Sequence, residues 1–213
     1  MKIILPIRAA LAVLCLLALT SVVHAGPPLI CHPYDIGNAK CLPGGTRDHF
    51  GLSAAYDRAN LVADTVALLT PDTPVIVRME TLRRAALYAT NEMNAWRENR
   101  AYGAAERELA LGLLAKLRER TQDAAVPRDL ALFDLGFYAE TLHQTRLDPA
   151  LDGYALLAKA AELRPADPDV QFALALASVH PKRSEHAAHL AQARAGAEPG
   201  TLLALNLRSH FSH

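Results

Sequence analysis

The sequence predicts an all-α fold, in which antiparallel helical hairpins stack side by side behind an irregular N-terminal strap. From about residue 53 onward, apolar residues recur at three and four positions, the period of an amphipathic helix. The period-two alternation that is typical of half-buried strands is rare. Proline and glycine interrupt the helical stretches at short intervals, so we expect successive helices to turn back on one another.

The first 25 residues have the pattern of a secretory signal. Lys2 and Arg8 precede a long uncharged run, which ends at Ala25 with small residues where a signal peptidase cleaves. Thr20 and Ser21 interrupt this run, whereas a membrane anchor normally needs about 20 apolar residues. We therefore expect export to a periplasm or out of the cell, with no membrane attachment after cleavage.

Length and charge limit the possible classes of function. The chain has 213 residues with 22 basic and 22 acidic side chains, and loss of Lys2 and Arg8 with the leader leaves a net negative charge. Residues 51–213 are of a size that one domain can bury around a single core. A nucleic-acid partner or an anionic membrane surface would call for a basic patch, which the pattern lacks.

Residues 26–50 form the predicted strap, which is rich in turn-forming proline and glycine. The strap contains Cys31 and Cys41, and thiols outside the cytoplasm tend to pair. A disulfide between them would add about 3 kcal/mol in the chain-entropy model. Two alternatives stay open: unpaired thiols, and a metal site that uses Cys31, His32 and Cys41 with His49, although this spacing matches no established zinc pattern.

The helical part begins with four long predicted helices. Ser53 and Thr73 are the expected N-caps of the first two, and Pro74 occupies the first turn of the second. The fourth has apolar residues around its first half, so we expect it at the centre of the assembly. The predicted ranges are Ser53–Leu69, Pro74–Glu98, Gly103–Arg120 and Asp129–Gln144.

The second predicted helix carries both its apolar face and a group of arginines. Its apolar face includes Met93 and Trp96, which we expect in the core. Arg83 and Arg84 could hold a carboxylate ligand, but a solvated face on which Glu80 pairs with Arg84 is the more ordinary interpretation.

The C-terminal part shows a repeat. Pro165 and Pro199 are 34 residues apart, and new helices are expected to start near Asp148, Asp167 and Ser184. The stretch from Tyr154 to Pro168 resembles the second helix and following turn of a tetratricopeptide repeat. The resemblance covers about residues 130–207 and implies a short α-solenoid with a concave face that binds peptides or other proteins.

A second resemblance involves the strap and the string from Arg78 to Ala86. Both are similar to a group of exported bacterial proteins of unknown role. In that group we expect serine at the position of Cys41 and tryptophan at the position of Gly44. The resemblance implies that the strap does not depend on a disulfide, and it supplies no activity.

Only weak signals for chemistry are present. Glu140 and His143 form one Glu-x-x-His pair, whereas di-iron bundles use two such pairs with two further glutamates. His186 and His189 lie one helical turn apart and could hold a surface metal, with His180, His210 and His213 nearby in the sequence. No nucleophile elbow, phosphate-binding loop, dinucleotide fingerprint or zinc-protease motif occurs.

The sequence therefore predicts an exported, non-catalytic helical repeat protein that binds a peptide or protein and needs no cofactor. Tyr154, Arg164 and Phe172 are the expected contact residues, because aromatic and arginine side chains dominate binding surfaces. The main alternative is a small helical metal-binding protein, using Glu140 and His143 or the Cys31, His32 and Cys41 segment. A structural or chaperone-like helper without a specialised pocket is a third hypothesis.

Overall fold

The computed structural model describes residues 27–44, 52–179 and 182–211. Within these ranges the protein is built of helices and connecting loops, and the pairing of Gly44 with Leu52 is an isolated bridge. None of the helices in these ranges is long and apolar enough to cross a membrane. The predicted signal, His49, His180 and His213 lie outside the described residues.

The predicted all-α class is confirmed. A short 3-10 turn (Arg58–Asn60) leads into the first of the α-helices, and successive helices are joined by loops. The α-helices are α2 (Leu61–Leu68), α3 (Val75–Thr90), α4 (Glu92–Arg97), α5 (Ala104–Arg120), α6 (Arg128–Gln144), α7 (Gly153–Leu163), α8 (Pro168–Ala177), α9 (His186–Ala195) and α10 (Leu202–Phe211).

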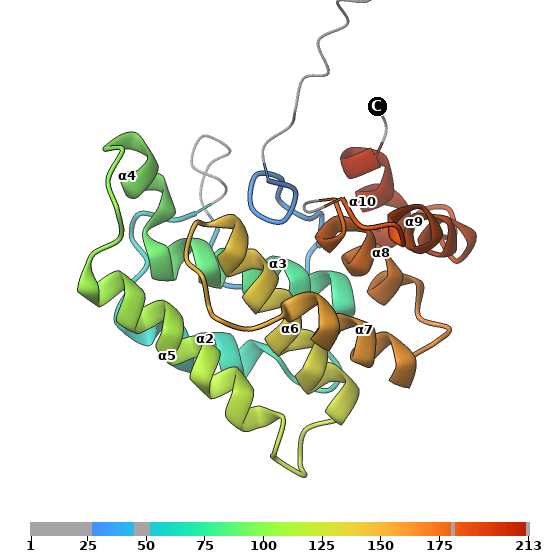
Figure 1. Cartoon of the computed structure of the whole chain (residues 1–213), viewed down its shortest axis with the longest axis horizontal. Helices are drawn as coiled ribbons and strands as arrows, with labels where there is room; N and C mark the ends of the chain where they lie inside the picture. The colour runs from blue at the N-terminus through green and yellow to red at the C-terminus, as the bar shows by residue number, and fades with distance from the viewer. Residues whose placement is uncertain (1–26, 45–51, 180–181, 212–213) are drawn as a thin grey trace, which may run out of the picture.

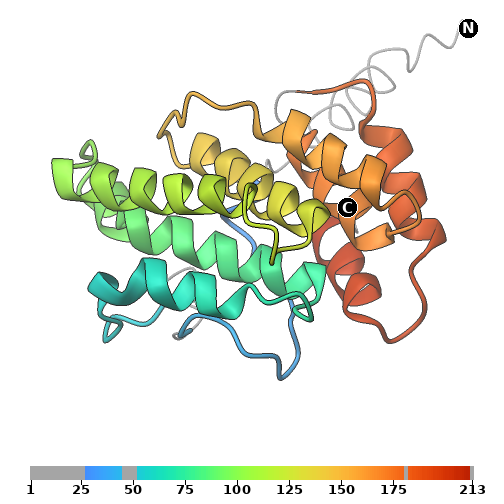
Figure 2. The ribbon, with the colours of Figure 1, turned by 90° about the horizontal axis from the view of Figure 1, so that it is seen from below.

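The helices form two groups that share a core. Helices α2, α3 and α5 lie side by side, and α6 packs against α3 and α5 (Figure 2). Helices α7 to α10 gather at the other end of the molecule, where α7 pairs with α6 and α9 pairs with α8 (Figure 1). Because α8 also contacts α3 and α6, one hydrophobic core runs through both groups.

Local capping chemistry explains several helix starts. Asp167 caps α8, accepting hydrogen bonds from the next backbone N–H groups, with Pro168 at the first helical position as predicted. Two predicted starts were too early. The first helix begins near Arg58, where Asp57 rather than Ser53 provides the cap, and α7 begins after Asp152, whose carboxylate accepts a hydrogen bond from the backbone N–H of Ala155.

The second predicted helix is interrupted at Asn91. This residue adopts a left-handed conformation with φ of 48°, so α3 ends at Thr90 and α4 starts in a new direction. The residues after Asn91 therefore no longer continue the helical periodicity of α3, and the prediction of one shared core face depended on that continuity. Trp96 is therefore 66% exposed instead of buried, which corrects the prediction.

Helix α3 is buried on all sides, contrary to the solvated arginine face predicted for it. Every α3 residue except Arg84 is buried. Arg78 forms a two-point ion pair with Asp134 of α6, with Nε–Oδ1 and Nη2–Oδ2 distances of 2.9 and 3.1 Å. Its Nη1 also donates to the carbonyl oxygen of Thr70, so one buried guanidinium ties α3 to α6 and to the preceding turn.

A second buried charge cluster on α3 binds the N-terminal segment, residues 27–44. Glu80 accepts hydrogen bonds from Arg83, from Arg84 and from the backbone N–H of Tyr34. Arg83 donates to the carbonyl oxygen of Ile30 at 2.8 Å, and Arg84 donates to that of Leu42 at 2.6 Å. The Glu80–Arg84 pair was predicted, but it lies inside the protein and holds a distant part of the chain.

Tyr34 connects this segment to the other helices. Its ring is 3% exposed, stacks on His210 of α10 at 5.0 Å, and meets the edges of Phe137 and Phe172 at 6.2 Å. The neighbouring backbone of Asp35 exchanges two hydrogen bonds with the side chain of Asn206 on α10. The N-terminal segment thus contacts helices from both groups.

The predicted disulfide is not formed in the structure, where Cys31 and Cys41 are both free thiols. The sulfur of Cys41 lies 3.4 Å from the hydroxyl of Thr81 on α3. The path of the segment is set by its hydrogen bonds to α3 side chains, so no sulfur bridge is needed to hold it. Burial raises the pKa of both thiols.

Replacing Glu80 should show how strongly the charge cluster stabilises the fold. We expect Glu80→Gln to lower the free energy of unfolding by about 3–5 kcal/mol, because Arg83 and Arg84 would lose the negative charge buried beside them. Glu119→Gln, in an exposed pair with Lys116, should change it by less than about 1 kcal/mol. Urea unfolding of the three proteins tests this, and equal losses in the two variants would contradict it.

The crossing of α6 and α7 depends on two glycines. A Cβ atom on Gly136 would lie 2.7 Å from the carbonyl oxygen of Gly153, too close for either backbone to accommodate. We expect Gly136→Ala to destabilise the protein by about 1–3 kcal/mol. Gly112→Ala, within α5 where a Cβ meets nothing within 4 Å, should instead stabilise it by about 0.5–1 kcal/mol. Thermal and urea unfolding will show whether the two effects have opposite signs.

Candidate functional site

The structure does not bring the three predicted partner-binding residues together on an exposed face. Phe172 is completely buried in the core, so it cannot contact a partner, and Tyr154 is only 9% exposed. Arg164 is partly exposed and lies near two carboxylates, 3.5 Å from Asp129 and 3.2 Å from Asp167. The prediction failed because the sequence does not show that Tyr34 of the N-terminal segment and His210 and Phe211 of α10 pack against the ring of Phe172.

The histidines of α9 serve as hydrogen-bonding groups within the fold. His186 Nδ1 donates to the carbonyl oxygen of Ala175 at 2.9 Å. His189 Nδ1 donates to Gln171 Oε1 at 2.8 Å, so its Nε2 can accept a hydrogen bond from the hydroxyl of Tyr154 at 2.9 Å. Helices α7, α8 and α9 are joined through this chain of side chains.

Glu140 and His143 lie on one cavity wall but do not form a metal centre. Glu140 is 7% exposed and accepts a hydrogen bond from the backbone N–H of Tyr154, whereas His143 Nε2 lies 3.0 Å from the carbonyl oxygen of Leu151. Within the described ranges, no group of three histidine, cysteine, aspartate or glutamate side chains is arranged to hold a metal ion. This finding covers the segment of Cys31, His32 and Cys41 as well.

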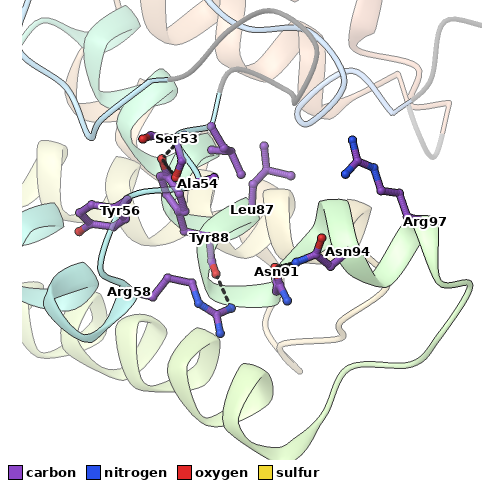
Figure 3. Close-up of a pocket in the computed structure, with 10 residues that line it drawn as sticks. Ser53, Ala54, Tyr56, Arg58, Leu87, Tyr88, Asn91, Asn94 and Arg97 are labelled. Atoms are coloured by element: carbon purple, nitrogen blue, oxygen red, sulfur yellow. Dashed lines mark hydrogen bonds between the residues drawn. The ribbon is translucent and has the colours of Figure 1, made fainter.

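A surface cleft of about 370 Å³ lies where α3 gives way to α4, and Figure 3 shows its walls. One wall is the chain leading into α2, which contributes Ser53, Tyr56 and Arg58. The opposite wall is the end of α3 with α4, contributing Tyr88, Asn91, Asn94 and Arg97. The side chains drawn there come from segments that are distant in the sequence, brought together by the packing of α2 on α3.

Hydrogen bonds fix the geometry of the cleft. The Tyr88 hydroxyl donates to the carbonyl oxygen of Pro43 and accepts from the backbone N–H of Ser53, both at 2.7 Å. Arg58 Nη1 donates to the carbonyl oxygen of Tyr88 at 3.1 Å, and the rings of Tyr56 and Tyr88 lie 4.6 Å apart. These contacts hold the lining residues in place without a ligand, which lowers the entropy cost of binding.

The chemistry of the cleft favours recognition over catalysis. Burial raises the pKa of the Tyr56 hydroxyl, and its hydrogen bond to Asp64 raises it further. Burial likewise raises the pKa of Tyr88, so both phenols stay protonated at neutral pH. The described residues that line the cleft include two guanidinium groups and two amides, with no carboxylate, imidazole or thiol among them.

Sequence reasoning missed this site. Its residues are spread over the irregular stretch before α2, the end of α3 and α4, and no short motif joins them. One signal was available, because asparagine tolerates the left-handed conformation and so permits a helix to stop at Asn91. Recognition of that break would have placed Trp96 outside the core.

Comparisons of the chain with family models, curated proteins and solved structures found no match.

The network around His189 predicts a pH-dependent stability. Burial lowers the pKa of His189, an effect that Glu185 opposes and His186 reinforces. The folded state then binds fewer protons than the unfolded chain, whose histidine pKa is about 6.5, so this stabilisation is complete above about pH 6.5 and is lost as the pH falls. We expect His189→Gln to cost about 1 kcal/mol at neutral pH and less near pH 5. Urea unfolding of both proteins across this range is the measurement, and a difference that does not change with pH would refute it.

Proposed function

We propose that this chain is an exported, non-catalytic helical protein that binds an extended peptide segment of another protein in the cleft between α2 and the α3–α4 break. The observation that carries the proposal is the 66% exposure of Trp96 on α4, the same short helix that contributes Asn94 and Arg97 to the cleft. An exposed tryptophan leaves a large apolar surface in contact with water, which a bound partner would cover. Tryptophan, tyrosine and arginine are also the residues that dominate binding energy.

The arrangement of the C-terminal helices supports the repeat-like part of the proposal. Helix α6 pairs with α7, and α8 pairs with α9, while α8 also packs on α6 and α7. Helix α10 contacts both α8 and α9, as a terminal helix would cover the last repeat. We therefore propose a short tetratricopeptide-like stack behind the cleft, with the N-terminal strap packed along α3.

The charges of the cleft favour a particular class of segment. Arg58 is cationic, and the described lining has no acidic side chain to repel a carboxylate. The backbone carbonyl that Arg58 Nη1 contacts orients its guanidinium without neutralising it. A segment with an aspartate or glutamate for Arg58 and an apolar side chain for Trp96 fits these features.

The proposal can be tested through Trp96, because it is the single tryptophan of the chain. We expect a synthetic hexapeptide that alternates aspartate with leucine to shift the tryptophan emission to shorter wavelength in a saturable way. The same peptide with lysine in place of aspartate should bind at least about tenfold more weakly, since Arg58 would repel it. Fluorescence titration of the full chain measures both affinities.

Variants distinguish specific binding in the cleft from non-specific binding to the protein surface. With a labelled acidic peptide and polarisation as the readout, Trp96→Ala should weaken binding by about tenfold or more, and Arg58→Gln should do the same. Leu163→Ala and Arg118→Gln change exposed residues on α7 and α5 and should leave the affinity unchanged. Equal effects in the two pairs of variants, or no binding of either peptide, would overturn the proposal.

A further inference from the structure

A second hollow, with a volume of about 650 Å³, lies beside α6 at the level of Glu140 and His143. Its walls come from α6, from the loop that enters α7, from Pro27 and from Arg183, which precedes α9. The volume falls within the range of small-molecule pockets. The cavity is separate from the α3–α4 cleft, and the two share no lining residue.

Arg183 is held in position at this cavity by stacking. Its guanidinium carbon lies 4.0 Å from the centre of the Tyr154 ring, a cation–π arrangement. Tyr154 is itself fixed by its hydrogen bond to His189, which is bonded in turn to Gln171. Among the described residues Arg183 forms no ion pair, and its Nε has no hydrogen-bond partner. The structure thus orients a cation that has no direct carboxylate partner among the described residues.

Gln144 adds a second donor to the same cavity. Its Oε1 accepts a hydrogen bond from the backbone N–H of Leu29 at 2.8 Å, which assigns the other end of the amide as Nε2. That nitrogen is buried and has no acceptor among the described residues. A buried donor without an acceptor costs about 1–3 kcal/mol, so a bound acceptor would recover this energy.

Two carboxylates line the same cavity. Glu140 and Asp152 each use one oxygen to accept a backbone hydrogen bond, from Tyr154 and Ala155 respectively, and neither forms an ion pair within the described ranges. Burial raises the pKa of Glu140, Arg183 and His143 oppose that rise, and Asp152 adds to it. Arg183, His143 and Asp152 therefore all lie close enough to Glu140 to affect its pKa.

We propose that this cavity binds a free α-amino acid, with Arg183 and Gln144 holding its carboxylate and with Glu140 and Asp152 holding its ammonium group. A zwitterion supplies both charges on neighbouring atoms, as a site with separate donors and acceptors requires. A phosphate or other polyanion would meet the two carboxylates, and a cation alone would meet Arg183. This inference is independent of the peptide-binding proposal, since it concerns different residues.

Binding is tested on the full chain with the standard amino acids as probes, each titrated by calorimetry at millimolar concentrations. Acetate and methylammonium serve as half-probes that carry one charge each. We expect at least one amino acid to bind about tenfold or more tightly than either half-probe, because only the zwitterion contacts both sets of groups. Failure of every amino acid to bind, or acetate binding as tightly as the best amino acid, would overturn the inference.

Conservative variants test the assigned roles with little change in shape. Gln144→Glu keeps the acceptor for Leu29 but replaces the donor by an oxygen, and Glu140→Gln keeps the acceptor for Tyr154 but removes the charge. Each should weaken amino-acid binding by about tenfold or more, as should Arg183→Gln. Gln192→Glu and Arg208→Gln make the same chemical changes at exposed positions and should have no effect. Circular dichroism verifies folding, and unchanged affinity in the cavity variants would refute the assignment.

Discussion

The carboxylate of Glu80 lies inside the protein, beside the guanidinium groups of Arg83 and Arg84 and the backbone N–H of Tyr34. A buried charge is costly unless it is paired and hydrogen-bonded, so these groups stabilise the fold only when all of them are in place. If the N-terminal segment left α3, the cluster would be exposed, and Glu80, Arg83 and Arg84 would lose their hydrogen bonds to the backbone of that segment. Since the same segment also packs on α10 through Tyr34, the arrangement of both groups of helices depends on this contact.

The central position of α3 follows from that constraint, and so does the location of the cleft. One side of α3 is covered by helices and another by the N-terminal segment, and the chain becomes partly exposed at Asn91, directly after α3 ends. At that end, Asn91 turns the chain and α4 projects from the core with Trp96 exposed. One wall of the cleft is supplied by the chain before α2, and the hydroxyl of Tyr88 forms hydrogen bonds with both Ser53 of this chain and Pro43.

The two parts of the sequence that carried the second resemblance, the strap and the string from Arg78 to Ala86, are in direct contact. This contact has a physical basis, because Glu80, Arg83 and Arg84 of the string form hydrogen bonds with the backbone of Tyr34, Ile30 and Leu42. The disulfide prediction assumed that the strap needs a covalent link to keep its shape. In the structure both thiols are free, and hydrogen bonds to α3 hold residues 27–44 in place. The residues of the cleft could not be predicted as a site, because the stretch before α2 has no helical or strand periodicity and no motif links it to the end of α3 and α4.

What the sequence determined by itself was the helical class, most helix ends and the cap at Asp167, because these depend on interactions between residues a few positions apart, whereas the predicted cap Thr73 makes no capping hydrogen bond to α3. Asp167 with Pro168 marks a helix start from local chemistry alone, and the structure agrees. Only the tertiary structure decided which polar faces are buried. Helical period separates an apolar face from a charged one, but it cannot show that a charged face, such as that of Arg78 and Arg83, will meet oxygen atoms from segments tens of residues away. Those long-range partners turned a predicted surface into the interior, whereas the break at Asn91 left Trp96 exposed.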